Sequence, residues 1–163
     1  MSGEEGVIER EILISAPPET VFDFLINPAL MAHWIGRFHK LEPHPGGIFQ
    51  LEVSPGNVAR GFYTEVSPPH RVAFTWGWES KDPTLAMLPP GESLVEIDLV
   101  RVESGTLLHL RHSRLPEAMS EMHRDRWWRY LTVLQSVASG RDRGEAITLK
   151  PPIDREAGNR LDQ

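Results

Sequence analysis

The amino-acid sequence predicts a two-layer α+β fold, in which one antiparallel sheet packs against a long C-terminal helix. Between Ile48 and Leu115, five segments alternate apolar and polar residues with the period of two that is typical of half-buried strands. Glu117–Ser139 instead repeats apolar residues every three or four positions, which is the spacing of an amphipathic helix. Because each of these apolar faces must be buried, the sheet and the helix are expected to cover one another.

The chain is expected to open with a strand and two short helices. In Val7–Ile14, isoleucines alternate with glutamates, and Arg10 is the one polar residue on the apolar face. The prolines that follow favour the start of a helix that runs to about Ile26. A second short helix is expected over Ala29–Trp34.

Five more strands complete a predicted sheet of about six. Residues 37–47 are interpreted as a polar loop, and short turns between the later segments favour antiparallel pairing. The five expected strands are Ile48–Val53, Arg60–Ser67, Arg71–Glu79, Ser93–Val102 and Thr106–Leu115.

One connection, Ser80–Glu92, is long and unusually apolar. It contains three prolines and the run Leu85–Leu88, and it is expected to lack regular structure. Long loops in compact domains are usually functional, and exposed apolar residues mark contact sites. The loop is therefore a candidate lid over a ligand, or a contact between two copies of the chain in a homodimer.

Composition limits the classes of protein to which the chain can belong. At roughly 100–200 residues per domain, its 163 residues fit one domain, which we assign to residues 1–140. The charged, proline-containing residues 141–163 are expected to form a mostly disordered tail. A formal net charge of −6 disfavours nucleic acid and anionic lipid as partners.

The absence of cysteine excludes disulfides, thiol nucleophiles and Cys-ligated metal centres. The longest apolar runs have about four residues, far fewer than the roughly 20 of a membrane helix. The acidic N-terminus lacks the apolar segment of a signal peptide, so the cytoplasm is the expected location. The motifs of serine hydrolases, dinucleotide and nucleotide sites and zinc proteases are also missing, and no cofactor is expected.

Short motifs over most of the chain, from about Ile8 to Ala138, resemble one superfamily. The opening is similar to that of the START-like (SRPBCC, helix-grip) superfamily and reads Ile12-x-Ile14-Ser15-Ala16-Pro17-Pro18-Glu19-x-Val21-Phe22. Later motifs resemble its subfamily of homologues of the activator of Hsp90 ATPase, and they are Gly46-Gly47-x-Phe49, Gly61-x-Tyr63-x-Glu65-Val66-x-Pro68-Pro69-x-Arg71, Phe74-Thr75-Trp76, Gly105-Thr106-x-Leu108-x-Leu110-x-His112 and Trp127-x-x-x-Leu131-x-x-Leu134.

The resemblance implies a curved sheet that grips the long C-terminal helix around an internal apolar cavity. It leaves three functions open, because the superfamily includes lipid and hormone carriers as well as polyketide cyclases. The leading interpretation is a non-enzymatic protein that binds a small hydrophobic ligand between sheet and helix. The alternatives are a chaperone accessory protein of the stress response and a cyclase or hydrolase that uses an inward histidine.

Large side chains are expected on the inner face of the sheet and on the facing helix. They would form the wall of a ligand site by stacking on a flat or elongated apolar molecule, or they would simply fill the core. The predicted ligand-binding residues are Trp34, Phe49, Phe74, Trp76, Trp78, Leu110 and Trp127, with His112 and His123 as polar anchors.

Three side chains are candidates for acid–base chemistry. His112 and His123 are both predicted to point inward, where each would orient a ligand, move a proton, or serve as a hydrogen-bonded core histidine; we favour the last. With no carboxylate in register, they do not predict a metal site. Glu65 would be a base with a raised pKa if it faced inward, but a surface position is favoured. The histidines expected to be solvated in or beside polar loops are His33, His39, His44 and His70.

Overall fold

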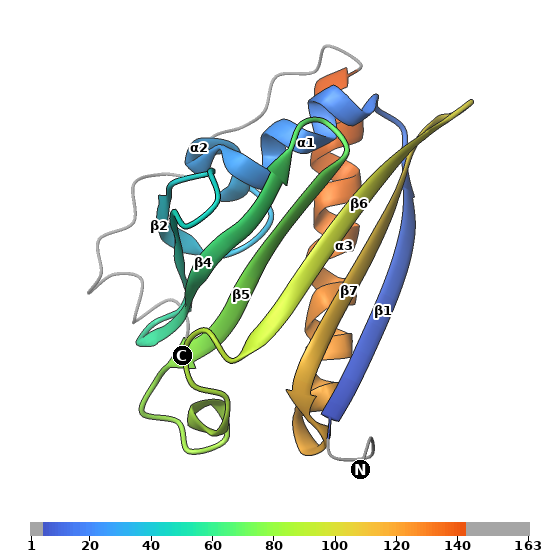
Figure 1. Ribbon diagram of the computed structural model, residues 1–163. Coiled ribbons are helices and arrows are strands. Elements are labelled where there is room, and N and C mark those ends of the chain that lie inside the picture. The colour runs from blue at the N-terminus through green and yellow to red at the C-terminus, as the bar shows by residue number, and fades with distance from the viewer. Residues whose placement is uncertain (1–4, 143–163) are drawn as a thin grey trace.

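The computed structural model describes residues 5–142, in which a curved antiparallel sheet wraps around one long helix (Figure 1). Within this range the sheet has seven strands in the order β1-β7-β6-β5-β4-β3-β2. The strands are β1 (Glu5–Ile14), β2 (Arg37–Leu41), β3 (Ile48–Ser54), β4 (Asn57–Ser67), β5 (Arg71–Glu79), β6 (Ser93–Val102) and β7 (Gly105–Pro116). The helices are α1 (Pro18–Ile26), α2 (Pro28–Met31) and α3 (Ser120–Asp142), with short 3₁₀ turns at Leu85–Met87 and Glu117–Met119.

This architecture confirms the predicted α+β fold and all six predicted strands, but the sheet has one strand more. The additional strand, β2, lies where the sequence predicted a polar loop, and it pairs with β3 alone at the edge of the sheet. A five-residue edge strand with charged side chains carries almost no periodic signal, and such short, charged strands are a common way to protect a sheet edge.

Helices α1 and α2 are joined by a cap on one residue, Asn27. Its backbone N–H donates to the carbonyl of Asp23 and closes α1, while its side-chain oxygen accepts from the N–H of Ala29 at 2.9 Å and starts α2. The second helix is shorter than predicted, because Trp34 lies in the turn that follows it. The Trp34 indole N–H donates to the carbonyl of Phe24 at 2.8 Å, which ties this turn back to α1.

Helix α3 buries the predicted stripe that includes Trp127, Leu131 and Leu134, and its backbone lies closest to β1 and α1. The side chain of Arg10, the polar residue on the apolar face of β1, extends to the edge of the contact between β1 and α3. Its guanidinium lies 5.2 Å from the ring centre of Trp128, so its charge stays near solvent. The helix extends to Asp142, beyond the expected end of the domain, and the rest of the expected tail lies outside the described residues.

The register of the strands sets the shape of the inner face. Phe49 on β3 lies opposite Gly61 on β4, and Tyr63 lies opposite Phe74 on β5. Gly61 is required at its position, because a Cβ atom there would overlap the backbone carbonyl of Thr75 on β5. The bulky side chains of β3 and β5 therefore meet over a gap in β4, where no side chain separates them.

The connection Ser80–Glu92 is more structured than predicted. Its 3₁₀ turn buries Leu85, and Leu88 is also buried while its carbonyl accepts from the N–H of Trp78 at 2.7 Å. Gly77 leaves room for the loop, because a Cβ atom there would overlap the Pro89 carbonyl. The loop is therefore anchored to β5 through its apolar residues, and Met87 remains 52% exposed. None of the helices described is long and apolar enough to cross a membrane.

Candidate functional site

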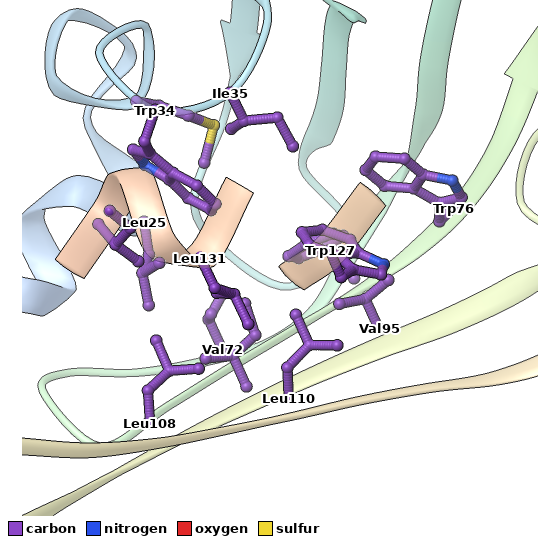
Figure 2. Close-up of a cluster of buried hydrophobic side chains, with 14 of the residues drawn as sticks. Leu25, Trp34, Ile35, Val72, Trp76, Val95, Leu108, Leu110, Trp127 and Leu131 are labelled. Atoms are coloured by element: carbon purple, nitrogen blue, oxygen red, sulfur yellow. The ribbon is translucent and has the colours of Figure 1, made fainter. Parts of the chain in front are cut away.

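Aromatic side chains gather between the sheet and α3, as predicted (Figure 2). The rings of Phe49 and Phe74 are stacked, with centroids 3.9 Å apart and planes 13° apart. Trp76 continues this group, with its ring centre 5.4 Å from that of Trp78 and 5.3 Å from that of Trp127. All five side chains are buried, so this cluster, which we call the aromatic core, joins β3 and β5 to the helix.

A small apolar cavity adjoins the aromatic core. Its volume is about 10 Å³, close to the minimum for one water molecule. Nine residues from both helical segments, the sheet and α3 line it: Leu25, Met31, Trp34, Ile35, Phe49, Leu51, Phe74, Ile97 and Trp127.

The structure divides the predicted wall into two groups. Four of its members line the cavity, namely Trp34, Phe49, Phe74 and Trp127, while Trp76, Trp78 and Leu110 are buried in the surrounding core. The lining residues that the site prediction missed are all aliphatic or Met. Leu25 and Ile97 could have been predicted from the sequence, because both lie on apolar faces expected to point inward. Met31 and Ile35 follow no periodic pattern in the sequence.

His112 lies on β7 with no exposed surface, and both of its ring nitrogens are engaged. Nδ1 accepts the indole N–H of Trp127 at 3.0 Å, and Nε2 lies 2.8 Å from the hydroxyl oxygen of Ser93. That hydroxyl donates to the carbonyl of Trp76 at 2.6 Å. Because an indole can only donate, Nδ1 carries no proton, so His112 is the neutral tautomer that donates from Nε2 to Ser93.

His123 on α3 faces His112, with ring centres 5.3 Å apart. Its hydrogen bonds require the tautomer that carries the proton on Nδ1. Nδ1 lies 2.9 Å from the carbonyl of Met119, which can only accept, so this nitrogen carries the proton. Nε2 accepts the indole N–H of Trp78 at 3.2 Å. The two histidines thus have all four ring nitrogens occupied inside the protein.

Both histidines are held in the neutral form. Burial keeps the pKa of His112 well below its usual value, and the neighbouring His123 adds to this lowering. Burial also lowers the pKa of His123; the bond to Met119 opposes this change, and the charge of Arg126 adds to it. Protonation of either ring would place a proton against an indole N–H, so the pair is suited to a structural role.

Two other polar groups in this region have no partner. The phenol oxygen of Tyr63 and the indole nitrogen of Trp76 are fully buried and make no hydrogen bond to any residue that the structure describes. Burial raises the pKa of Tyr63, so its hydroxyl keeps its proton. Tyr63 was not among the predicted site residues, because in period two it shares a strand face with Glu65, for which a surface position was favoured.

Glu65 lies outside the core, in agreement with the favoured interpretation. The pairing of β4 with β5 shifts by one residue between Tyr63 and Glu65, which turns the glutamate to the outer face. There Arg71 bonds to Glu65 at 2.8 Å, to Glu96 at 2.6 Å and to Asp98 at 2.9 Å. The hydrogen bond from Arg71 lowers the pKa of Glu65, the opposite of the change expected for a buried base.

Of the four histidines predicted to be solvated, two are exposed. His44 and His70 are exposed. His33, expected to be solvated, is buried because the chain turns inward after α2, and His39 is half-buried on β2 with Nε2 2.8 Å from the carbonyl of Ile35. Over residues 5–142, no three His, Asp or Glu side chains converge in a way that could hold a metal ion.

Comparisons with known proteins agree with this fold. The family model described as Activator of Hsp90 ATPase homolog 1-like protein matches residues 15–139. The AHSA1-like protein of Rhizobium etli, solved by NMR, is 39% identical, with 93% of this chain and 92% of that chain covered and a TM-score of 0.67. A search of curated proteins finds no match.

Two further solved structures share the fold at lower identity. A crystal structure from Mesorhizobium loti is 22% identical, with 86% of this chain and 100% of that chain covered and a TM-score of 0.73. The Aha1 dimer of Colwellia psychrerythraea is 20% identical, with 82% of this chain and 96% of that chain covered and a TM-score of 0.67. From the family match, which spans most of the chain, and the identity to the Rhizobium protein, we conclude that the chain belongs to the AHSA1-like family, whose fold is the START-like helix grip.

Proposed function

We propose that this protein binds a small hydrophobic ligand between the sheet and α3. One observation carries the proposal: side chains from α1, the segment around α2, three strands and α3 converge on one entirely apolar cavity. Apolar pockets with a few polar groups are the usual form of small-molecule sites. Burial of apolar surface, worth roughly 25 cal/mol per Å², would drive the binding.

The cavity of about 10 Å³ is much smaller than such a ligand, so the side chains around it must move. The packing indicates where this can happen. The backbone of α3 lies against β1 and α1, whereas long aromatic side chains span the space between α3 and β3–β5. Rotation of Trp76 or Phe49 would free volume there without separating the helix from its backbone contacts.

The interior histidines favour binding over catalysis. A general acid or base needs a nitrogen that can reach the substrate, and both rings use their nitrogens within the protein. We therefore assign His112 and His123 a role in positioning Trp127 and Trp78. An enzyme that uses either histidine would lose its rate in His112→Ala or His123→Ala, which is how that alternative is tested.

Native mass spectrometry tests the proposal directly. We expect the purified protein to carry an excess mass of a few hundred daltons, typical of a drug-sized ligand, that is lost on denaturation. Ile97→Phe, which adds volume to the cavity wall, should abolish the excess, while Val100→Phe at an exposed position of the same strand should retain it. An apo mass for all three proteins, together with no binding of added apolar compounds, would contradict the proposal.

The family name favours a second candidate, a chaperone accessory protein that acts through its outer surface. On this hypothesis Trp76→Ala lowers stability but leaves partner binding intact. A pull-down from native lysate that recovers an Hsp90-type chaperone would support it, and a pull-down without one would count against it. Both candidate functions are compatible with the expected cytoplasmic location.

A homodimer is also proposed, with the exposed Met87 of the loop Ser80–Glu92 at the contact. The Colwellia relative is described as a dimer in solution. Light scattering should then give twice the chain mass for the protein and a lower mass for Met87→Glu. A monomer at high concentration would exclude this contact.

A further inference from the structure

Among the four buried tryptophans, one indole N–H has no hydrogen-bond acceptor in the part of the chain that the structure describes. Trp34 donates to the Phe24 carbonyl, Trp78 to His123 and Trp127 to His112. Trp76, in the middle of the same core and 2% exposed, has no acceptor among the described residues. A buried donor without a partner costs about 1–3 kcal/mol, so a protein that satisfies the neighbouring indoles and not this one requires an explanation.

The phenol of Tyr63 is a second such donor, and its ring belongs to the same aromatic cluster. Tyr63 and Trp76 lie on adjacent strands, and the rings of Phe49 and Phe74 contact both of them. Phe49 and Phe74 also line the cavity. The two rings that carry these donors therefore flank the stacked pair that forms one wall of the proposed ligand site.

The orientation of the Trp76 indole indicates on which side of the ring a hydrogen-bond acceptor would have to lie. In Figure 2 the nitrogen of Trp76 is on the side of the ring that faces away from Trp127. An acceptor for this nitrogen therefore lies on the side of the Trp76 ring opposite Trp127.

The charge of the surroundings limits the type of acceptor. Among the described residues no Lys or Arg is fully buried, and the Arg37 guanidinium, whose side chain is 11% exposed, lies 4.0 Å from the Glu52 carboxylate, so an interior carboxylate would lack a cation of its own. A pure hydrocarbon would leave both donors unsatisfied. A neutral oxygen, as in a ketone, an ester or an ether, satisfies a donor without adding a buried charge.

We propose that the interior ligand is a neutral, mostly apolar molecule with an acceptor oxygen that receives a hydrogen bond from Tyr63 Oη or Trp76 Nε1. This inference rests on the proposed function, because it specifies the chemistry of a ligand in the same site. It assigns the two donors as the residues that determine ligand specificity.

A matched pair of probes tests this assignment. 2-Acetylnaphthalene and 2-isopropenylnaphthalene have nearly the same shape and differ in a carbonyl oxygen against a methylene group. By calorimetry at pH 7.5, we expect the ketone to bind about 2- to 10-fold more tightly, the range of one net hydrogen bond. 2-Naphthoate, which is charged at this pH, should bind more weakly than the ketone.

Two variants then locate the donor. Tyr63→Phe or Trp76→Phe should bring the affinity ratio of ketone to alkene close to one, and the ratio is independent of any general loss of affinity from altered packing. Tyr130→Phe, which removes a half-buried phenol that contacts Trp127, is the matched control and should keep the ratio.

The outcomes separate the two proposals. Equal binding of ketone and alkene by the unmodified protein, or a ratio unchanged in both variants, overturns the assigned donors and leaves the proposed function intact. Tighter binding of naphthoate overturns the neutral acceptor. Failure of all three probes to bind overturns the proposed function and this inference together.

Discussion

The indole N–H of Trp127 donates to Nδ1 of His112 at 3.0 Å, which joins α3 to β7 inside the core. A second bond of the same type, from Trp78 to His123, joins β5 to α3 in the opposite direction. Each indole fixes the tautomer of its histidine, and each histidine satisfies a buried indole. The helix is therefore held to the sheet by specific polar contacts within an apolar interior.

The neutral histidine pair predicts that stability decreases in mild acid. The pKa values of both rings are lowered in the folded protein, so below about pH 6.5 the unfolded chain binds protons that the folded chain does not. The free energy of unfolding should be constant above about pH 7.5. It should decrease below pH 6.5 by up to about 1.4 kcal/mol per pH unit for each histidine.

Urea unfolding between pH 5 and 8 measures this dependence. The carboxylates with lowered pKa values contribute only near and below their usual pKa of about 4.5, outside this window. His44→Gln, at an exposed position, should leave the profile unchanged. A free energy that is constant from pH 5 to 8 would show that the histidines are not held neutral.

Replacing Trp127 by Phe should destabilise the protein by about 3 kcal/mol, because it leaves Nδ1 of His112 without a donor and opens space in the core. The same change at Trp128, which is 42% exposed on the next position of the helix, should cost less than about 0.5 kcal/mol. Chemical denaturation of both variants gives the comparison. Similar costs at the two positions would contradict the structural role of the Trp127–His112 bond.

Gly61→Ala should cost about 1–3 kcal/mol or more, because its new methyl group would overlap the Thr75 carbonyl and force β4 away from β5. Thr64→Ala, at an exposed position of the same strand, is the control and should have little effect. Thermal unfolding of the two variants measures the difference. If Gly61→Ala is as stable as the unmodified protein, the two strands do not approach as closely as described.

The cluster of carboxylates around Arg71 predicts a different pH response. Hydrogen bonds from Arg71 lower the pKa of Glu65 and of Glu96, so their contribution is present above about pH 4.5 and is lost as the pH falls through the lowered values. Arg71→Ala should reduce stability at pH 7 and flatten its decrease below pH 4.5. Arg60→Ala, which removes one exposed ion pair with Glu79, should change neither property clearly. Unfolding curves at pH 3 to 7 distinguish the two variants.

Alternation alone placed several parts of the site correctly. Period two put Trp76 and Trp78 on the inner face of one strand and His112 on that of another, and the helical spacing turned His123 and Trp127 toward them. Each of these side chains is buried. Successive side chains of a strand point to opposite faces of the sheet, and only one face is covered by the helix. The same alternation would place Glu65 on the inner face together with Tyr63. A shift in the pairing of β4 with β5, which the sequence does not reveal, instead places Glu65 on the outer face.

The sequence by itself thus determined the fold class, the family and most of the residues on the inner faces of the strands and of the long helix, since these follow from local periodicity and short motifs. The tertiary structure decided what depends on distances between separate elements. It made β2 an edge strand, buried His33, reduced the cavity to about 10 Å³ and left Tyr63 and Trp76 without acceptors within residues 5–142. Periodicity reports the face on which a side chain lies, whereas volume and hydrogen bonding depend on the atoms of other elements that surround it.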